Sequence, residues 1–536
     1  MPADVFPVAV GGVWQPSSDA GGTFTAFNPQ TGEVLPGEYP VSGAADLEAV
    51  LAAAAGATTA LQAVPAEVRA TFLERFADLL EADADALTRM AHHETALPLT
   101  GRLLQNELPR TTGQLRQAAH CVRERSWVRP VIDTQLGLRS MFGPMHGAAV
   151  VFGPNNFPFA FNAVSGGDFA AAIAAGLPVI AKAHPAHPGT SRLLAQHALE
   201  ALRATPGLPT GTVQMLYHLP PELGRRLVSD RRVAATAFTG SRTGGLALKG
   251  ASDAPSIPFY GELSSVNPVV ILPGALEERL EALADELFTS CTLGSGQFCT
   301  NPGLVFVPDG AAGRGFVAAL AHRFAAAPPG VLFTRDAPPH LEEVVGRLQG
   351  AGAQIEAGGR ASGPGFRFST TLLSVPGEVM VQNPQVLGQE AFGPVCLVVL
   401  VRGMEGFQAA LSILEGNLTG TLYSAADGTD DALYAALAPL LRVRVGRLLN
   451  DRMPTGVAVS PAQQHGGPFP ATTHPGFTSV GLPAAITRFA ALQSYDHVRD
   501  ARLPEELRDT NPLGIQRCVD RVWTAEPLSQ PGDHHG

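Results

Sequence analysis

Short apolar runs alternate with segments of helical length between residues 147 and 273, and this alternation restricts the possible folds more than any other feature of the chain. Residues 163–175 and 189–204 have the length and composition of helices, and Gly176 is a typical helix stop. Strands alternating with helices predict a parallel sheet covered on both faces. We therefore expect an α/β fold. The apolar runs predict strands at residues 148–152, 177–181, 213–216, 234–238 and 269–272.

A further helix is predicted at residues 276–290, where apolar side chains fall on one face and Glu and Asp on the other. It leads into Gly294-Ser-Gly-Gln-Phe-Cys299, where the glycines should end the helix and open a loop. A second α/β stretch is expected over residues 300–460. A chain of 536 residues is long enough for two to four domains.

The charge balance excludes several classes of partner. The formal net charge is −11, and Lys and Arg form no basic stripe, so we expect neither nucleic acid nor an anionic membrane surface as a partner. The chain has no uninterrupted run of about 18 apolar residues. Its first residues, Met-Pro-Ala-Asp, lack the basic start of a signal peptide. The expected compartment is the cytoplasm.

The cysteines and histidines do not predict a disulfide framework or a metal site. The cysteines are an odd, sparse set without a Cys-x-x-Cys pair. His92-His93-Glu94 and the pair His184 and His187 lack H-E-x-x-H spacing and a nearby third ligand, so no metal is expected. The five cysteines are Cys121, Cys291, Cys299, Cys396 and Cys518.

Three residues stand where their local setting allows catalysis. Cys299, in a loop of small residues, can be a nucleophile if its surroundings favour the thiolate, or a buried apolar thiol. Glu262, between two apolar runs, can be a general base or a helix-capping residue. Asn156, at the end of a predicted strand, can donate to an oxyanion or form an ordinary turn.

Ser241 follows a predicted strand and begins a helix, so it can contact a pyrophosphate or simply cap that helix. Neither G-x-G-x-x-G nor G-x-x-x-x-G-K-[ST] occurs. A bound nucleotide would therefore be held in another way.

Six motifs taken together resemble the aldehyde dehydrogenase superfamily, in the same order along the chain. The similarity extends outwards to residues 26–33 and 478–481 and so covers nearly the whole sequence. The motifs are Gly-Pro-Asn-Asn-Phe-Pro (153–158), Ala-Lys-Ala-His-Pro (181–185), Phe-Thr-Gly-Ser (238–241), Glu-Leu-Ser-Ser-Val-Asn-Pro (262–268), Gly-Gln-Phe-Cys-Thr (296–300) and Gln-Glu-Ala-Phe-Gly-Pro-Val (389–395).

The resemblance implies NAD(P)-dependent oxidation of an aldehyde to a carboxylic acid through a thioester. Cys299 matches the nucleophile, Glu262 the base that activates water, and Asn156 the oxyanion donor, which the backbone N–H of Cys299 assists. Lys182 matches the residue that binds the adenine ribose, and Glu390 the carboxylate on the nicotinamide ribose. The other implied cofactor contacts are Pro154, Gly240, Ser241 and Phe392.

Two positions depart from the family pattern. Arg242 follows Thr-Gly-Ser where a small Thr is common, and Pro185 stands where a Glu often holds the ribose 2′-hydroxyl. Without that carboxylate a 2′-phosphate would not be repelled, so the expected cofactor is NADP or NAD. Lys182 and His184 or His187 are the candidate phosphate contacts.

Within the family, the chain most resembles the 2-oxoglutarate semialdehyde (2,5-dioxopentanoate) dehydrogenases. For such a substrate we expect a cation at the far carboxylate, with Arg452 the first candidate and His465 the second. Two alternatives are an enzyme for broad or long-chain aldehydes and a catalytically silent relative. Cys299, Glu262 and Asn156 together argue against the silent relative. The resemblance rests on residues 183–190, 294–303, 453–457, 465–472 and 511–514.

The family resemblance also implies a three-part fold and a homodimer or homotetramer. It places a Rossmann-like NAD(P)-binding domain at residues 1–133 and 152–264, and an α/β catalytic domain at 265–465. A small β oligomerisation element would comprise residues 134–151 and 466–536.

Overall fold

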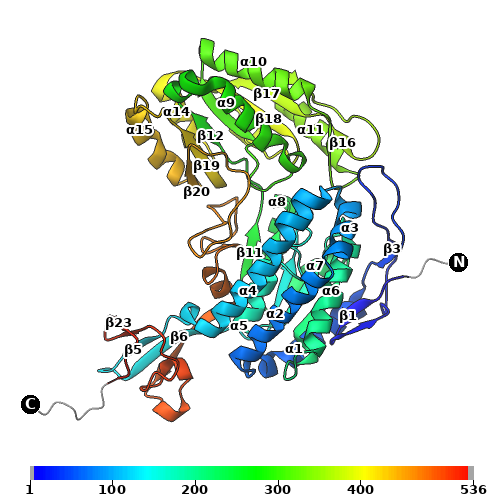
Figure 1. The fold of residues 1–536 in the computed structure, drawn as a ribbon, viewed down its shortest axis with the longest axis vertical. Helices are drawn as coiled ribbons and strands as arrows, with labels where there is room; N and C mark the ends of the chain where they lie inside the picture. Colours follow the sequence, from blue (N-terminus) through cyan, green and yellow to red (C-terminus); the bar gives the residue numbers. More distant parts are fainter. Residues whose placement is uncertain (1–4, 529–536) are drawn as a thin grey trace, which may run out of the picture.

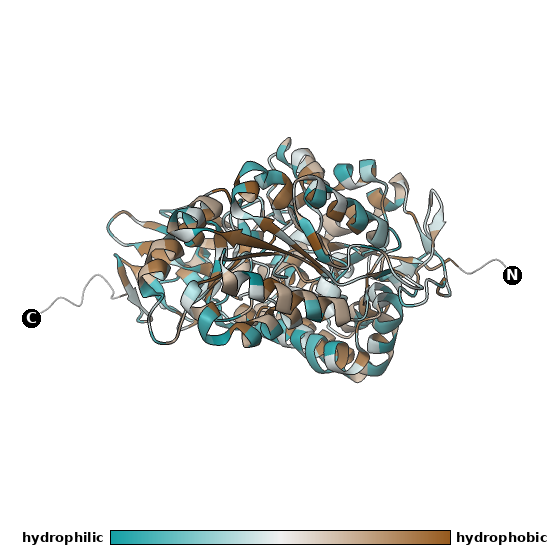
Figure 2. Cartoon of the chain, turned by 90° about the horizontal axis from the view of Figure 1, so that it is seen from above, coloured by the Kyte–Doolittle hydropathy of each residue, from teal (hydrophilic) through white to brown (hydrophobic). Residues whose placement is uncertain are grey.

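Two seven-stranded sheets and one five-stranded sheet organise the chain in a computed structural model, which describes residues 5–528. Figure 1 shows the first large sheet with helices α1 to α7 in the lower body and the second with α9, α10, α14 and α15 in the upper body. The small sheet projects from the lower body, close to the C-terminal end. In Figure 2 the apolar strands run through the interior, and hydrophilic residues lie on the outer helices.

The first sheet confirms the α/β fold class. Strands β11 to β9 in its order are parallel, and β1 joins β9 antiparallel. Every residue of β7 and β9 is buried, as expected for strands with helices on both faces. In spatial order the strands are β11 (Phe259–Glu262), β10 (Val233–Thr239), β7 (Ala148–Phe152), β8 (Val179–Lys182), β9 (Val213–Leu216), β1 (Val8–Val10) and β2 (Val13–Gln15).

Helices cover both faces of this sheet. The predicted helix stop at Gly176 is confirmed, because this residue caps α5 in the left-handed region, with φ of 93°. A π-helical turn, η1 (Leu99–Glu107), leads directly into α4. The helices are α1 (Ala44–Gln62), α2 (Ala66–Ala82), α3 (Ala84–Thr95), α4 (Leu108–Glu124), α5 (Gly167–Ala175), α6 (Pro188–Arg203), α7 (Pro221–Val228) and α8 (Arg242–Asp253), with the short β3 (Thr23–Phe24) and β4 (Tyr39–Pro40) pairing nearby.

Helix α1 is the one described helix that is long and apolar enough to cross a membrane by length and composition. It contributes Leu47, Val50 and Leu51 to the main hydrophobic core, where each is fully buried. Core helices of this kind pass the same length and composition test. Its packing therefore accounts for its apolar character.

The second sheet takes the strand predicted at residues 269–272, which forms β12. That strand therefore lies outside the first sheet, because the chain crosses to the upper body after β11. The strands of the second sheet all pair in parallel except β15, an antiparallel edge strand. In spatial order they are β15 (Gln354–Ala357), β17 (Thr371–Pro376), β18 (Val395–Val401), β13 (Leu304–Pro308), β12 (Val269–Ile271), β19 (Asn417–Tyr423) and β20 (Val445–Asn450).

Helix α9 (Pro273–Thr292) confirms the helix predicted at residues 276–290, although Arg279 departs from helical geometry. The loop expected after it begins with the short helical turn η4 (Leu293–Gly296). The remaining elements of this body are α10 (Ala311–Ala326), β14 (Gly330–Val331), α11 (Ala337–Gly350), β16 (Arg367–Phe368), α12 (Gly377–Gln382), α13 (Pro384–Leu387), α14 (Gly403–Ser412) and α15 (Asp431–Arg442).

The small sheet joins two distant parts of the chain. Its strands differ from the boundaries expected for the oligomerisation element, which were residues 134–151 and 466–536. Its first segment begins at β5, while residues 148–152 form β7 in the middle of the first sheet. All five side chains of β7 are buried and apolar, so this strand needs cover on both faces. Residues 466–483 precede this sheet and lie against the end of β11, where the N–H of Leu263 donates to the carbonyl of Ala471. The strands in order are β21 (Ala490–Asp496), β6 (Leu138–Pro144), β5 (Val131–Asp133), β22 (Arg517–Val519) and β23 (Val522–Thr524).

A buried ion pair ties the C-terminal segment to the first sheet's helices. Arg488, only 1% exposed, lies in the turn η5 (Ala484–Phe489) and donates to Asp168 in the first turn of α5 at 2.7 Å. Its guanidinium also stacks on Phe477 and Phe489. Further short turns are η2 (Ser126–Val128), η3 (Thr210–Thr212), η6 (Asp500–Arg502) and η7 (Glu505–Leu507).

Removing the carboxylate of this pair should destabilise the protein strongly. Asp168→Ala leaves the Arg488 guanidinium buried without its counter-charge, which costs about 3 kcal/mol or more in the free energy of unfolding. Denaturant unfolding of the purified protein measures the change. Asp85→Ala is the matched control, because Asp85 also lies in the first turn of a helix but forms an exposed pair with Arg89. Its effect should stay below about 1 kcal/mol. Equal effects of the two substitutions would contradict the structural role of the buried pair.

Candidate active site

A cavity of about 480 Å³ opens where the two bodies meet. Three of the segments that line it directly follow the carboxyl ends of β7, β10 and β11 in the first sheet. Ligands of α/β proteins bind at such strand ends. The cavity brings together most of the predicted site residues, namely Pro154, Asn156, Gly240, Ser241, Glu262, Cys299, Glu390 and Phe392.

The loop that presents Cys299 depends on backbone conformations that favour glycine. Gly294, Ser295 and Gly296 have φ of 57°, 57° and 69°, all in the left-handed region. A Cβ at Gly296 would lie 2.1 Å from the carbonyl oxygen of Gly393, so only glycine fits there. This turn ends the helical segment and leaves Cys299 partly buried at the cavity wall.

Two amide side chains fix the position of this loop. Asn267 Nδ2 donates to the carbonyl oxygens of Cys299, at 2.9 Å, and of Asn301, at 2.8 Å. Asn156 Nδ2 donates to the carbonyl oxygen of Gln297 at 3.0 Å. Asn156 therefore lies beside the nucleophile loop, as an oxyanion donor requires. In the sequence Asn267 is one residue of the motif at 262–268, and nothing local indicates its role. Its contact with the nucleophile loop depends on the tertiary fold.

Cys299, His465 and Glu262 form one hydrogen-bonded row. Cys299 Sγ lies 3.4 Å from His465 Nε2, which lies 3.1 Å from Glu262 Oε1. His465 and Glu262 are each 1% exposed. Ser479 Oγ donates to the other oxygen of Glu262 at 3.4 Å. Such a row can move a proton between its members.

The electrostatics of the row favour the neutral thiol when no ligand is bound. Burial raises the pKa of Cys299 well above its usual range, and the Glu262 carboxylate raises it further. The positive charge of Arg110 acts in the opposite direction. The Cys299 sulfur, a His465 ring nitrogen and a Glu262 carboxylate oxygen all lie within 4.8 Å of one another. Atoms of these types at this spacing can also hold a metal ion.

His465 therefore has a different position from the one expected of it. Its contacts with Cys299 and Glu262 put it at the reacting centre, not at the far end of an acidic substrate. Arg452 is exposed, with only its backbone carbonyl in a hydrogen bond, to Thr421. The arginines whose charges act on Cys299 are instead Arg110 and Arg447, which the sequence patterns did not single out.

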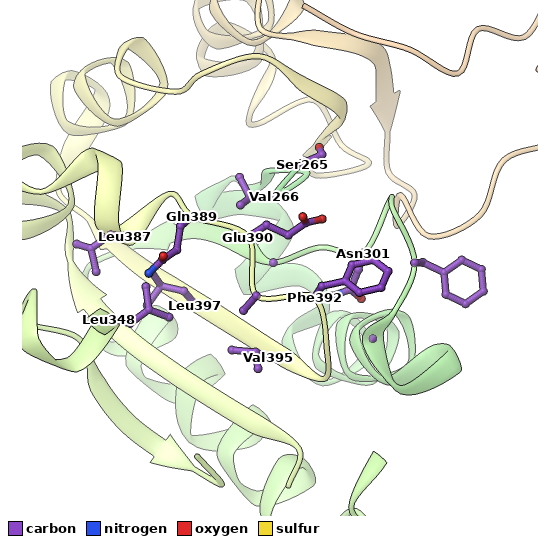
Figure 3. Close-up of a pocket in the computed structure, with 14 residues that line it drawn as sticks. Ser265, Val266, Asn301, Leu348, Leu387, Gln389, Glu390, Phe392, Val395 and Leu397 are labelled. Atoms are coloured by element: carbon purple, nitrogen blue, oxygen red, sulfur yellow. The ribbon is translucent and has the colours of Figure 1, made fainter. Parts of the chain in front are cut away.

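Glu390 and Phe392 lie on the loop that leads into β18 and also line a smaller cavity, which Asn301 lines as well (Figure 3). Burial raises the pKa of Glu390 to about 7, while hydrogen bonds from the Ser264 side chain and the Ser265 backbone oppose the rise. A ribose hydroxyl can bind a carboxyl group placed in this way. Their location agrees with the cofactor contacts that the family resemblance implies.

Ser241 is the N-cap of α8, where its Oγ accepts from the Gly244 N–H at 3.3 Å. Ser241 therefore caps the helix, and it can also contact a pyrophosphate. The start of α8 faces the cavity, and its backbone N–H groups can hold a phosphate. Arg242 lines the same cavity and donates to Glu415 at 2.7 Å.

Lys182 ends β8 and lies among three histidines. Burial lowers the pKa of Lys182 to about 8 and lowers that of His184 well below its usual range. The charges of His187, Lys182 and His218 lower the His184 pKa further, so these four groups are close to one another. His184 lines the cavity; Lys182 itself does not line it.

This basic cluster fits a phosphate-bearing cofactor. The Nδ1 atoms of His187 and His218 are buried without a partner among the described residues. Pro185 contributes no carboxylate to the cluster. A 2′-phosphate would supply the missing negative charge and hydrogen-bond acceptors. The residues present therefore suit NADP as well as NAD.

Comparison with known proteins identifies the family of this chain. Residues 14–428 match the model of the aldehyde dehydrogenase family. The chain is 42% identical over 511 residues to alpha-ketoglutaric semialdehyde dehydrogenase 2 of Azospirillum brasilense, covering 93% of this chain and 96% of the relative. It is 37% identical over 467 residues to alpha-ketoglutaric semialdehyde dehydrogenase of Acinetobacter baylyi, covering 85% and 87%.

Solved structures have the same fold. An aldehyde dehydrogenase from Bacillus cereus superposes with a TM-score of 0.78 at 21% identity, covering 92% of this chain and 97% of the other. A 3,6-anhydro-L-galactose dehydrogenase in complex with NAP gives a TM-score of 0.78 at 23% identity, covering 92% and 99%.

Replacing Glu262 should make the free Cys299 thiol more reactive. Since the Glu262 carboxylate raises the pKa of Cys299, Glu262→Gln removes a negative charge and lowers that pKa. Below the thiol pKa, the thiolate fraction rises about tenfold for each unit of decrease. Alkylation by iodoacetamide at pH 8, followed on the Cys299 peptide by mass spectrometry, should therefore accelerate. Alkylation of Cys518, a partly exposed thiol in β22 of the small sheet, is the internal control. Slower alkylation of Cys299 would show that Glu262 deprotonates the thiol.

Proposed function

The chain belongs to the aldehyde dehydrogenase family and catalyses NAD(P)-dependent aldehyde oxidation, and from this premise we propose that its substrate is 2-oxoglutarate semialdehyde, oxidised to 2-oxoglutarate through a thioester on Cys299. The observation that carries the mechanism is the row of Cys299, His465 and Glu262 at the wall of the cavity. The two alpha-ketoglutaric semialdehyde dehydrogenases among its relatives support the substrate.

In the first step Cys299 Sγ attacks the aldehyde carbon. The thiol loses its proton as the new bond forms, and His465 Nε2, 3.4 Å from the sulfur, can take it when this nitrogen carries no proton of its own. The carbonyl electron pair moves onto oxygen, where Asn156 Nδ2 and the backbone N–H of Cys299 donate to it. The positions of Asn156 and of the Cys299 loop, fixed by their amide contacts, support this role.

A bound nicotinamide would supply the acceptor for the hydride that leaves the carbon of this adduct. Glu390 and Phe392 would hold the nicotinamide half, while the start of α8 and the basic cluster at Lys182 would hold the pyrophosphate and the adenosine half. Loss of the hydride leaves a thioester on Cys299.

In the last step Glu262 takes a proton from a water molecule, and the hydroxide attacks the thioester carbon. The carbon–sulfur bond then breaks, the carboxylic acid departs and the Cys299 thiolate re-forms. The burial of Glu262 and its hydrogen bonds from His465 and Ser479 hold its carboxylate next to the sulfur.

The small sheet supports a homodimer or homotetramer. It exposes large apolar side chains at Leu136, Leu492, Val522 and Trp523, each at least 60% exposed. Exposed apolar groups that lie on one element are typical of protein–protein contacts. We assign the first sheet with its helices to cofactor binding, the second to the nucleophile loop, and the small sheet to oligomerisation. The five free cysteines support the cytoplasm as the compartment, because reducing surroundings preserve free thiols.

The two half-reactions should separate in Glu262→Gln. This variant keeps the side-chain volume but lacks the base for hydrolysis, so it should release about one reduced nicotinamide per active site and then turn over about 10²–10⁴-fold more slowly. Stopped-flow absorbance at the nicotinamide band measures the burst, and denaturing mass spectrometry should find the acyl group on the Cys299 peptide. Cys299→Ser, the control, should show neither. If Glu262→Gln gives no burst and no adduct even at pH 9, its role in hydrolysis is wrong.

The cofactor choice should follow position 185. With Pro185 the enzyme should use NADP at least as well as NAD, because no carboxylate repels the 2′-phosphate. Pro185→Glu adds a negative charge beside the basic cluster and should raise the KM for NADP about tenfold or more, with the KM for NAD changed far less. Steady-state kinetics with both cofactors tests this. A hundredfold preference of the wild type for NAD in kcat/KM would refute it.

A further inference from the structure

Two arginines near Cys299 lack the counter-ion that a buried guanidinium needs. Arg110 lies in the first turn of α4, and Arg447 lies in β20. Within residues 5–528 neither forms an ion pair with a carboxylate; their hydrogen bonds go to backbone carbonyls alone. Nε and Nη2 of Arg110 and Nε of Arg447 are buried without an acceptor among the described residues.

Both arginines hold the same loop. Arg110 Nη1 donates to the carbonyl of Val457 at 2.9 Å, and Arg447 Nη2 donates to those of Pro454 and Gly456, each at 3.0 Å. The two guanidinium groups, from different bodies of the fold, therefore converge on residues 454–457.

That loop lies next to the nucleophile. The N–H of Gly456 donates to Oγ1 of Thr300, the residue after Cys299, at 3.0 Å. Val457 packs against an apolar cluster that contains Phe157, Phe161 and Phe298.

Arg110 lies over two rings of the same cluster. Its guanidinium carbon is 5.2 Å from the Phe161 ring centre and 5.7 Å from that of Phe157. Phe161 in turn lies 5.9 Å, ring centre to ring centre, from His465, the residue in contact with Cys299. Arg110 is thus connected to the reacting sulfur through two successive side-chain contacts, with Phe161 and then His465.

The charges of both arginines are electrostatically linked to the sulfur. Burial lowers the pKa of each guanidinium, while the negative charge of the Cys299 thiolate opposes that decrease in both. Glu262 and Glu107 also act on Arg110 in this direction.

A neighbouring arginine shows what a neutralised guanidinium looks like in this protein, although its Nε also has no acceptor among the described residues. Arg102 stacks on Phe157, with its guanidinium carbon 4.4 Å from the ring centre, but it forms an ion pair with the buried Glu107. Glu107 in turn accepts from the N–H groups of Phe159 and Ala160. Arg102 is therefore a structural residue, and its neutralised charge is not free to select a substrate.

We propose that Arg110, assisted by Arg447, binds the carboxylate at the far end of the aldehyde substrate and so selects short aldehydes that end in a carboxylate. A guanidinium that is buried and unpaired is strongly unfavourable, and a carboxylate is the group whose geometry satisfies it in bidentate fashion. The aromatic cluster then covers the methylene groups between the two ends. This assignment rests on the proposed function and replaces Arg452 as the carboxylate-binding residue.

The test compares an acidic with a neutral aldehyde of equal length in matched variants. Arg110→Met keeps the apolar stem that packs on the phenylalanines but removes the charge. It should raise the KM for 2,5-dioxopentanoate about thirtyfold or more and change kcat/KM for pentanal less than about threefold. Arg447→Met should act in the same direction, and Arg110→Lys should restore part of the loss. Arg89→Ala, which removes an exposed arginine paired with Asp85 on α3, should change neither substrate.

A measurement on the wild type keeps the proposal testable if a variant fails to fold. Glutarate, a five-carbon dicarboxylate, should inhibit pentanal oxidation competitively with respect to the aldehyde, while 1-pentanol at the same concentration should not. The proposal is overturned by equal loss on both aldehydes in Arg110→Met, or by absence of glutarate inhibition together with a wild-type preference for pentanal. That preference would instead favour an enzyme for neutral or long-chain aldehydes. Failure of the proposed function itself looks different: the wild type would then oxidise neither aldehyde, whatever residue stands at position 110.

Discussion

The hydrogen-bonded row of Cys299, His465 and Glu262 is the constraint on which the rest of the site depends. Its members come from three segments: the loop after α9, the end of β11, and the chain that crosses that end after β20. Burial makes the carboxylate and the imidazole effective partners, because little water competes for their hydrogen bonds. Burial also raises the pKa of the thiol. The cavity must therefore admit a substrate and cofactor while the row stays largely dry.

Backbone geometry supplies the precision that this row needs. The left-handed turn at residues 294–296 aims Cys299 at the cavity, and Asn267 fixes its carbonyl from the opposite side. The segment with His465 is held against β11 by the N–H of Leu263, which donates to the carbonyl of Ala471 at 2.7 Å. Asn156 reaches the nucleophile loop from the first body, where its Nδ2 donates to the carbonyl of Gln297, so the complete site exists only when both bodies have packed together.

The buried arginines divide into two kinds with different consequences. Arg488 and Arg102 have carboxylate partners and connect elements of the fold. Arg110 and Arg447 donate only to carbonyls, and Nε of both and Nη2 of Arg110 have no acceptor among the described residues. An unpaired buried charge is unfavourable in the free protein, and the site can recover that cost when an anionic substrate binds. An arginine paired with a carboxylate thus stabilises the fold, whereas an arginine without one can select the substrate.

The sequence by itself determined the local elements and the residue types of the chemistry. Apolar runs and glycine stops predicted β7, β9, α5 and α9, because burial and backbone freedom act over a few neighbouring residues. The motifs placed Cys299, Glu262 and Asn156 in one site, and the cavity brings them together. Contacts between distant residues decide that β12 pairs with β19 in the second sheet, that His465 contacts the nucleophile, and that the charge of Arg110 acts on Cys299. These facts depend on contacts between residues more than 100 positions apart, whose distances are set by how the two bodies pack and leave no local pattern in the chain.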